Sequence, residues 1–155
     1  SLVDHDWRSP MMLMTCFQAV GDKDNLQRAA KITLDRTEKV IARDPTNSSA
    51  MAAGAGALVR LGDEDRAREW IRRALLLDPD NLNMRYNVAC SLVAEFGDKE
   101  EAIEAIGPFF ERINSAIWMR HVDADPDLDP IRDDPRFVSM LSAAKQRQRT
   151  AAAAE

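Results

Sequence analysis

The stretch that decides the fold is residues 47–79, NSSAMAAGAGALVRLGDEDRAREWIRRALLLDP. Its two halves meet at Gly62-Asp63, and it ends at Asp78-Pro79. Glycine adopts the left-handed conformation that ends a helix, the aspartate after it can cap the next helix, and proline ends a helix because it lacks an amide donor. In the second half, the apolar side chains recur at intervals of three and four residues, at Ala67, Trp70, Ile71, Ala74 and Leu75. The stretch therefore predicts two helices joined by a tight turn.

The same markers recur on both sides of this stretch. Pro45 and Pro79 are 34 residues apart, and Gly-Asp pairs begin at Gly21, Gly62 and Gly97, at intervals of 41 and 35 residues. The first interval is seven residues longer than 34. Seven residues make about two helical turns, so the extra length can lie in one helix without changing the face that it presents. No alternating strand pattern competes with this periodicity, and the sequence predicts an all-α fold.

Residues 9–110 resemble three tetratricopeptide repeats, a family with a period of 34 residues. The unit that ends at Pro79 matches best, because it has small or apolar residues where the family has them: Ala55, Leu58, Gly62, Ala67, Ile71, Ala74 and Pro79. A further good match runs from Tyr86 to Ala102. Two departures are Met14, where a small residue is usual, and Pro108, which comes earlier than the terminal proline of the family.

The resemblance implies an α-α superhelix, or solenoid, of three helix hairpins. We place the repeats at about residues 9–45, 46–79 and 80–113, after an N-terminal linker at residues 1–8. The paired helices must approach closely at Ala55 and Ala89. In this family the first helix of each hairpin lines a concave face that binds other proteins.

A capping segment is predicted at residues 114–149, followed by a flexible tail at residues 150–155. Ser115 can cap a short helix that reaches His121, and Asp134 can cap a last helix from about Pro135 to Gln148. The sequence DPDLDPIRDDPRF at residues 125–137 is similar to the tail that closes repeat arrays of bacterial nucleotide cyclases and serine/threonine kinases. Since the chain begins with Ser1 and not with Met, we expect a processed product or a piece of a longer signalling protein.

Composition and charge argue against nucleic acid and membranes as partners. The formal net charge is −5, which does not favour binding to phosphates, so we expect neither nucleic acid nor an anionic membrane as partner. The longest apolar run, residues 50–59, has about half the length of a membrane span. We find no signal peptide and expect a cytoplasmic protein.

Several residue groups suggest chemistry, and we assign each of them to the fold instead. The aspartates at 123, 125, 127 and 129 alternate as calcium-loop ligands do, but Leu128 and Asp134 stand where an EF-hand needs glycine and glutamate, so we interpret them as helix caps and turn residues. Gly54 and Gly56 lack the third glycine and the preceding strand of a dinucleotide site, and helix packing accounts for them.

The remaining reactive side chains form no catalytic constellation. His5 and His121 lie at neither a metal nor a triad spacing. Cys16 and Cys90 are interpreted as buried, reduced thiols. The tryptophans are expected in the core or cap, with Trp7 as the one candidate for exposure. We therefore predict no enzymatic activity, no cofactor and no metal.

The concave face is the predicted partner-binding site. By helical phase, its residues are Arg8, Met11, Thr15 and Gln18, then Ser49, Ala52, Gly56 and Arg60, and then Asn83, Tyr86, Cys90 and Ala94. Small residues in the middle leave room for a peptide segment. Chaperone-tail binding repeats carry an Asn/Lys/Arg clamp for a carboxylate, and because only Asn87 resembles a member of it, we do not expect that class of partner.

The sequence thus predicts a non-catalytic protein-interaction or regulatory scaffold domain, which the ending associates with a bacterial signalling protein such as a nucleotide cyclase. The alternative is a self-association module. The first helix is apolar nearly all round, through Met11, Met12, Leu13, Met14, Cys16 and Phe17. A further hypothesis is therefore a homodimer through the N-terminal repeat, in which this helix pairs with its own copy or with the long helix at residues 24–43.

Overall fold

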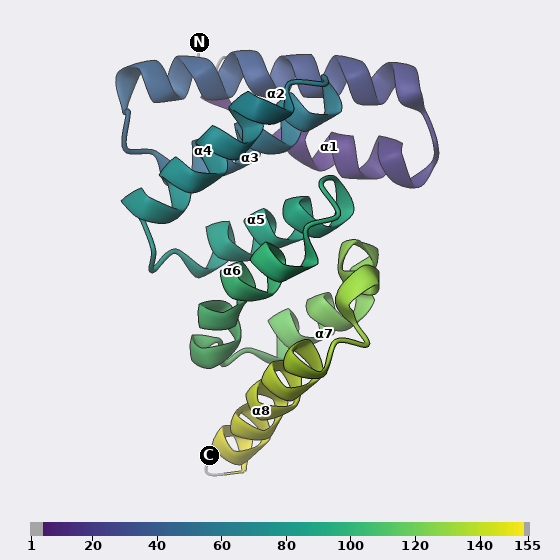
Figure 1. Cartoon of the computed structure of the whole chain (residues 1–155), viewed down its shortest axis with the longest axis vertical. Coiled ribbons are helices and arrows are strands. Elements are labelled where there is room, and N and C mark those ends of the chain that lie inside the picture. Colours follow the sequence, from purple (N-terminus) through teal and green to yellow (C-terminus); the bar gives the residue numbers. More distant parts are fainter. Residues whose placement is uncertain (1–4, 154–155) are drawn as a thin grey trace. The chain divides into compact units, whose positions relative to one another are not determined.

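The computed structural model describes residues 5–153, and no β-strand occurs in that range (Figure 1). Helices account for most of it, which confirms the all-α prediction. In chain order the elements are α1 (Arg8–Ala19), α2 (Lys23–Arg43), α3 (Ser48–Arg60), α4 (Glu64–Leu77), α5 (Leu82–Ala94), α6 (Lys99–Arg112), α7 (Ala116–Ala124), the 3-10 helix η2 (Pro126–Ile131) and α8 (Pro135–Ala152). Residues 1–4 of the predicted linker and residues 154–155 of the predicted tail lie outside the described range.

The chain divides into two compact units, Ser1–Pro79 and Asp80–Glu155. Unit 1 contains α1 to α4, and unit 2 contains α5 to α8. The division falls at Pro79, where we predicted the second repeat to end. Among the described residues, none of the helices combines the length and the apolar character that a membrane span requires.

In unit 1, α1 packs against α2, α2 against α3, and α3 against α4. The two Gly-Asp turns lie where the sequence predicted them. Gly21 and Gly62 have φ values of 72° and 87°, in the left-handed region that favours glycine. The carboxylates of Asp22 and Asp63 cap the helices that follow, accepting hydrogen bonds from the amides of Asn25 at 3.1 Å and Arg66 at 3.3 Å.

The extra length of the first interval lies in α2, as predicted. This helix has 21 residues, whereas α4, the second helix of the next hairpin, has 14. Because the difference is close to two full turns, α2 keeps one buried face along its length, formed by Ala29, Ala30, Thr33 and Thr37.

Gly54 in the middle of α3 is a packing residue. A Cβ atom placed there would lie 2.2 Å from Cζ3 of Trp70 and 2.7 Å from Oγ1 of Thr37. The indole of α4 therefore occupies the space that any side chain at Gly54 would need. This contact supports the assignment of Gly54 to helix packing.

The N-terminal region confirms one expectation and contradicts another. Trp7, the one tryptophan that we considered for exposure, is buried against Ala50 and Ala53 of α3, as expected for a core residue. Cys16 is exposed, because it lies on α1 opposite the buried Met14, whereas we expected a buried thiol. Of the apolar residues on α1, Met14 faces the core while Met12 and Leu13 face solvent.

In unit 2, α5 packs against α6 through a third turn at Gly97, with φ 68°, and Asp98 caps α6 through the amide of Glu101 at 3.2 Å. The prediction for this turn is confirmed. α6 continues through Pro108 to Arg112 and buries Phe109 and Phe110 fully.

The C-terminal elements begin at the predicted caps. Ser115 accepts a hydrogen bond from the amide of Trp118 at the start of α7, and Asp134 accepts one from the amide of Arg136 at the start of α8. α8 packs against α6 and continues to Ala152, beyond Gln148 where we predicted its end.

Candidate functional site

The predicted partner-binding residues of unit 1 lie on α1 and α3, two helices in contact with each other. Arg8 and Thr15 are exposed, and Met11, Ser49 and Arg60 are half-buried. Ala52 and Gly56 are buried. The structure thus brings these residues to neighbouring helices. We call this set, together with Gln18, the α1/α3 face. The prediction that Ala52 and Gly56 leave open room for a peptide segment is not supported, because both are buried.

Arg60 is held in place by both helices. Its Nε and Nη2 atoms donate to Oε1 of Gln18 at 3.2 and 2.7 Å, and its Nη1 atom donates to the carbonyl of Gly56 at 2.9 Å. The side chain of Gln27 in turn donates to the carbonyl of Arg60 at 2.7 Å. These bonds restrict the guanidinium to one orientation, so little side-chain entropy remains to be lost when a partner binds it.

Arg8 is the second cation of the α1/α3 face. Its guanidinium carbon lies 4.4 Å from the ring centroid of Trp7, a cation–π distance. Since Trp7 is itself buried, the indole gives Arg8 a fixed platform. Two oriented arginines suit a partner segment that carries carboxylates, which arginine binds through paired hydrogen bonds.

The predicted residues of unit 2 have a different environment. Asn83 is exposed, but Tyr86 and Cys90 are only 2% and 8% exposed. The prediction that these two side chains contact a partner directly is not supported, because the C-terminal segment of the same chain covers them. Helical phase alone did not reveal that η2 packs against α5.

Asp125 is the residue that fixes this segment on α5. Its Oδ2 atom accepts a hydrogen bond from the hydroxyl of Tyr86 at 2.6 Å, and it lies 3.8 Å from the sulfur of Cys90 and 3.7 Å from Nε2 of His121. Its Oδ1 atom accepts from the amide of Asp127 at 3.0 Å and so caps η2. One carboxylate therefore both starts the 3-10 helix and fastens it to α5.

The thiol and the phenol beside Asp125 stay protonated. Burial, with the carboxylates of Asp125 and Asp127 nearby, raises the pKa of Cys90 well above its usual value. Burial also raises the pKa of Tyr86, and the neighbouring Cys90 and Asp125 raise it further. A protonated thiol is a weak nucleophile, so this site has the chemistry of a hydrogen-bond donor set.

Metal binding is the other chemistry that this cluster could support. Among the residues that the structure describes, Cys90, Asp125 and Asp127 have donor atoms that all lie within 4.8 Å of one another. In this structure each oxygen of Asp125 accepts a hydrogen bond, from Tyr86 or from the amide of Asp127. The bond from Tyr86 attaches the C-terminal segment to α5.

The alternating aspartates do not converge on one centre. Asp123 accepts from Nζ of Lys145 at 2.6 and 2.8 Å, and Asp129 pairs with Nε of Arg132 at 2.6 Å. Asp125 is a cap, as the sequence predicted for this group.

Aromatic side chains support the same attachment. The ring of Tyr86 lies 5.1 Å from that of Phe109 and 5.2 Å from that of Trp118, measured between centroids. Phe110 meets Phe137 of α8 at 5.4 Å. Leu128 and Ile131 of η2 are fully buried. The C-terminal segment is thus part of the core of unit 2.

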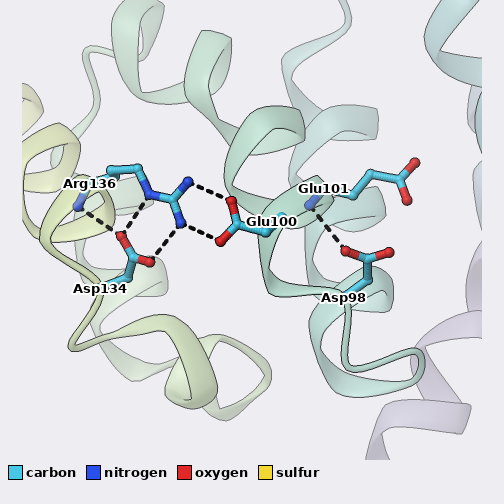
Figure 2. Close-up of polar contacts among 5 residues, drawn as sticks. All are labelled: Asp98, Glu100, Glu101, Asp134 and Arg136. Carbon is cyan, nitrogen blue, oxygen red and sulfur yellow. Dashed lines mark hydrogen bonds and ion pairs between the residues drawn. The ribbon is translucent and has the colours of Figure 1, made fainter.

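An ion-pair network ties α8 to α6 (Figure 2). Arg136 donates to both oxygens of Glu100 at 2.7 and 2.8 Å, and to Asp134 at 3.1 and 2.9 Å. Hydrogen bonds from Arg136 lower the pKa of Asp134 to about 2 and lower that of Glu100. Sequence analysis identified Asp134 as a cap, but it missed Glu100, which lies 36 residues from Arg136.

Comparisons with protein-family models, with curated proteins and with solved structures found no significant match to this chain. The resemblance to tetratricopeptide repeats therefore stays a prediction from the residues themselves.

Proposed function

We propose that this chain is a non-catalytic protein-interaction domain, built as a solenoid of three tetratricopeptide-type hairpins with a C-terminal cap. Three hairpins with Gly-Asp turns, and a last hairpin covered by α7, η2 and α8, support this proposal. A repeat array needs a capping element at its end, because the apolar face of the last repeat would otherwise be exposed to water.

The observation that carries the proposal is the contrast between the two predicted binding faces. On the α1/α3 face of unit 1, Arg8 and Thr15 are exposed and Arg60 is oriented by Gln18. In unit 2, Tyr86 and Cys90 on the corresponding side of α5 are covered by η2 of the same chain, and Tyr86 donates a hydrogen bond to Asp125. The α1/α3 face is therefore the binding site that we propose, and an extended segment with acidic side chains is its partner.

The ending of the chain extends the proposal to its biological setting. Because residues 125–137 resemble the tail of repeat arrays in bacterial nucleotide cyclases and kinases, we place this domain in the regulatory part of such a signalling protein. In that setting the domain would recruit a partner or report its presence to the catalytic part.

Peptide selection with a matched mutant tests the proposal. A displayed library of random peptides is selected on the intact chain, and bound peptides are mapped by two-dimensional amide NMR. We expect acidic sequences whose binding shifts the amides of Thr15, Ser49 and Arg60, and whose affinity falls with added salt because exposed charges are screened.

A charge-reversed variant, Arg8→Glu with Arg60→Glu, should bind these peptides about tenfold or more weakly. The control is Arg72→Glu with Arg73→Glu, which changes the net charge equally but lies on α4. Equal binding by both variants, or no selected peptide at all, would refute the proposed site.

A further inference from the structure

The outward side of α1 is an uncharged apolar stripe. Met12, Leu13 and Val20 are 66%, 48% and 76% exposed, and Cys16 is exposed between them. By helical phase these residues lie on the side of α1 away from the buried Met14, whereas Met11, Thr15 and Gln18 of the α1/α3 face lie to one side of them. We call Met12, Leu13, Cys16 and Val20 the α1 stripe.

The lack of charge distinguishes the α1 stripe from other exposed apolar residues. From Ser9 to Gly21 the sequence SPMMLMTCFQAVG has no charged side chain, although 30% of the whole chain is charged. The other large exposed hydrophobic residues lie on helices whose exposed positions include charges: Ile32 on α2, Leu76 and Leu77 on α4, Ile117 on α7 and Val138 on α8. Exposed apolar residues that are scattered among charges are common on soluble proteins, whereas a contiguous uncharged stripe marks an interaction site.

The spacing of the α1 stripe is symmetric. Met12, Cys16 and Val20 follow one another at steps of four residues, so they lie along one line with Cys16 at its centre. If a second α1 runs antiparallel along this line, Met12 of each copy meets Val20 of the other, and the two Cys16 residues meet at the two-fold axis. A self-complementary surface of this kind is what a two-fold contact requires.

Charge also favours a second copy as the occupant. A partner surface that covers an uncharged stripe must itself be uncharged, because a buried charge without a partner is costly. The α1 stripe of a second copy is an uncharged surface of this kind, so it can cover the α1 stripe of the first copy. We propose that two copies of this chain associate through antiparallel pairing of α1 about Cys16. Arg8 continues this line four residues before Met12, whereas Gln18 and Arg60 of the α1/α3 face lie outside it. The dimer test uses Met12 and Val20, which are not in the α1/α3 face, so either assignment can fail without the other.

A charge-swap experiment tests both the contact and its direction. Sedimentation of the intact chain over micromolar to submillimolar concentrations should show a monomer–dimer equilibrium. Met12→Glu and Val20→Lys should each raise the dissociation constant about tenfold or more, since each places a charge against an apolar side chain. In the double variant each Glu meets a Lys of the other copy, so dimerisation should return toward the wild-type value. Parallel pairing would instead place like charges together.

The thiol at the axis gives an independent readout. A short bis-maleimide should link two copies through Cys16, while Cys16→Ser should give no linked dimer, because Cys90 is buried. Since each copy has a net charge of −5, added salt should strengthen the dimer by screening repulsion.

Ile117→Glu, a charge on an exposed apolar residue of α7, is the control that should leave dimerisation unchanged. Melting curves confirm that each variant folds. A chain that stays monomeric at every concentration, or a double variant that dimerises no better than its single parents, overturns the proposal. Either result would leave the proposed binding of peptides to the α1/α3 face unaffected, because that binding is tested separately.

Discussion

The first helices of the second and third hairpins, α3 in unit 1 and α5 in unit 2, differ on the side where a partner is expected. On α3 this side includes Arg60, which Gln18 orients. On α5 it includes Tyr86 and Cys90, which lie beneath η2. Corresponding sides of two hairpins can thus differ in whether a distant segment of the same chain packs on them.

The difference shows that the position of a residue in a repeat does not decide its role. Tyr86 is at a place where a repeat offers a contact to a partner, and here its hydroxyl binds Asp125 of the same chain. The segment that caps the array can therefore cover a face that would otherwise bind a partner. The predictions below test this contrast between the units, beginning with the largest expected effect.

The close contact between Gly54 of α3 and Trp70 of α4 should be very sensitive to an added methyl group. Gly54→Ala should lower the free energy of unfolding by about 3 kcal/mol, because its Cβ would overlap the Trp70 ring. Gly107→Ala in unit 2 is the matched control, since the nearest atom to its Cβ is Sδ of Met140 at 3.8 Å, and it should change stability by less than about 1 kcal/mol. Urea unfolding measures both. Equal effects would mean that Trp70 moves aside freely.

Ala55 and Ala89 occupy the same place in the two units, and both are fully buried. Ala55→Leu and Ala89→Leu should each destabilise the fold by roughly 1–3 kcal/mol through overpacking. Thermal melting of both variants makes the comparison direct. An unchanged melting temperature for both would remove the argument that paired helices approach closely there.

Removal of one hydroxyl should loosen the cover of unit 2. Tyr86→Phe should cost about 1–2 kcal/mol, because Asp125 loses its 2.6 Å hydrogen bond in a buried site. It should also speed the labelling of Cys90 by a thiol reagent, while Cys16 reacts readily in both proteins. Thr15→Val, on the α1/α3 face, should change stability by less than about 0.5 kcal/mol. An unchanged labelling rate of Cys90 would contradict the proposal that the hydrogen bond between Tyr86 and Asp125 holds η2 against α5.

The smallest expected effect is the acid sensitivity of the α6–α8 link. The pKa of Asp134 is lowered to about 2 in the folded chain, so its contribution to stability is present above the unfolded pKa of about 4 and is lost as the pH falls towards 2. Arg136→Gln should flatten the loss of stability between these pH values, since hydrogen bonds from Arg136 lower that pKa. Arg73→Gln, which changes the net charge equally at an exposed site of α4, should retain the wild-type slope. Identical pH profiles for wild type and Arg136→Gln would contradict this account.

The sequence by itself determined the helices, their turns and most of their caps. Gly21, Gly62 and Gly97 end helices because only glycine adopts a positive φ at low cost, and the aspartate after each one reaches an amide three residues on. The seven-residue excess in α2 could also be predicted, because helical periodicity is local. Turns, caps and helical periodicity each depend on residues that are close together in the sequence, so they can be predicted from the sequence alone.

Which side of a helix is covered was decided only by the tertiary structure. Tyr86 is buried by residues 39 positions away, at Asp125, and Arg136 finds Glu100 across 36 positions. Trp7 is buried and Cys16 is exposed for the same reason, since both depend on how α1 packs against α2 and α3. Helical phase states which residues share a face, but it contains no information about the distant segment that lies on that face. Packing between segments far apart in the chain supplies that information, and with it the difference between a binding face and a covered one.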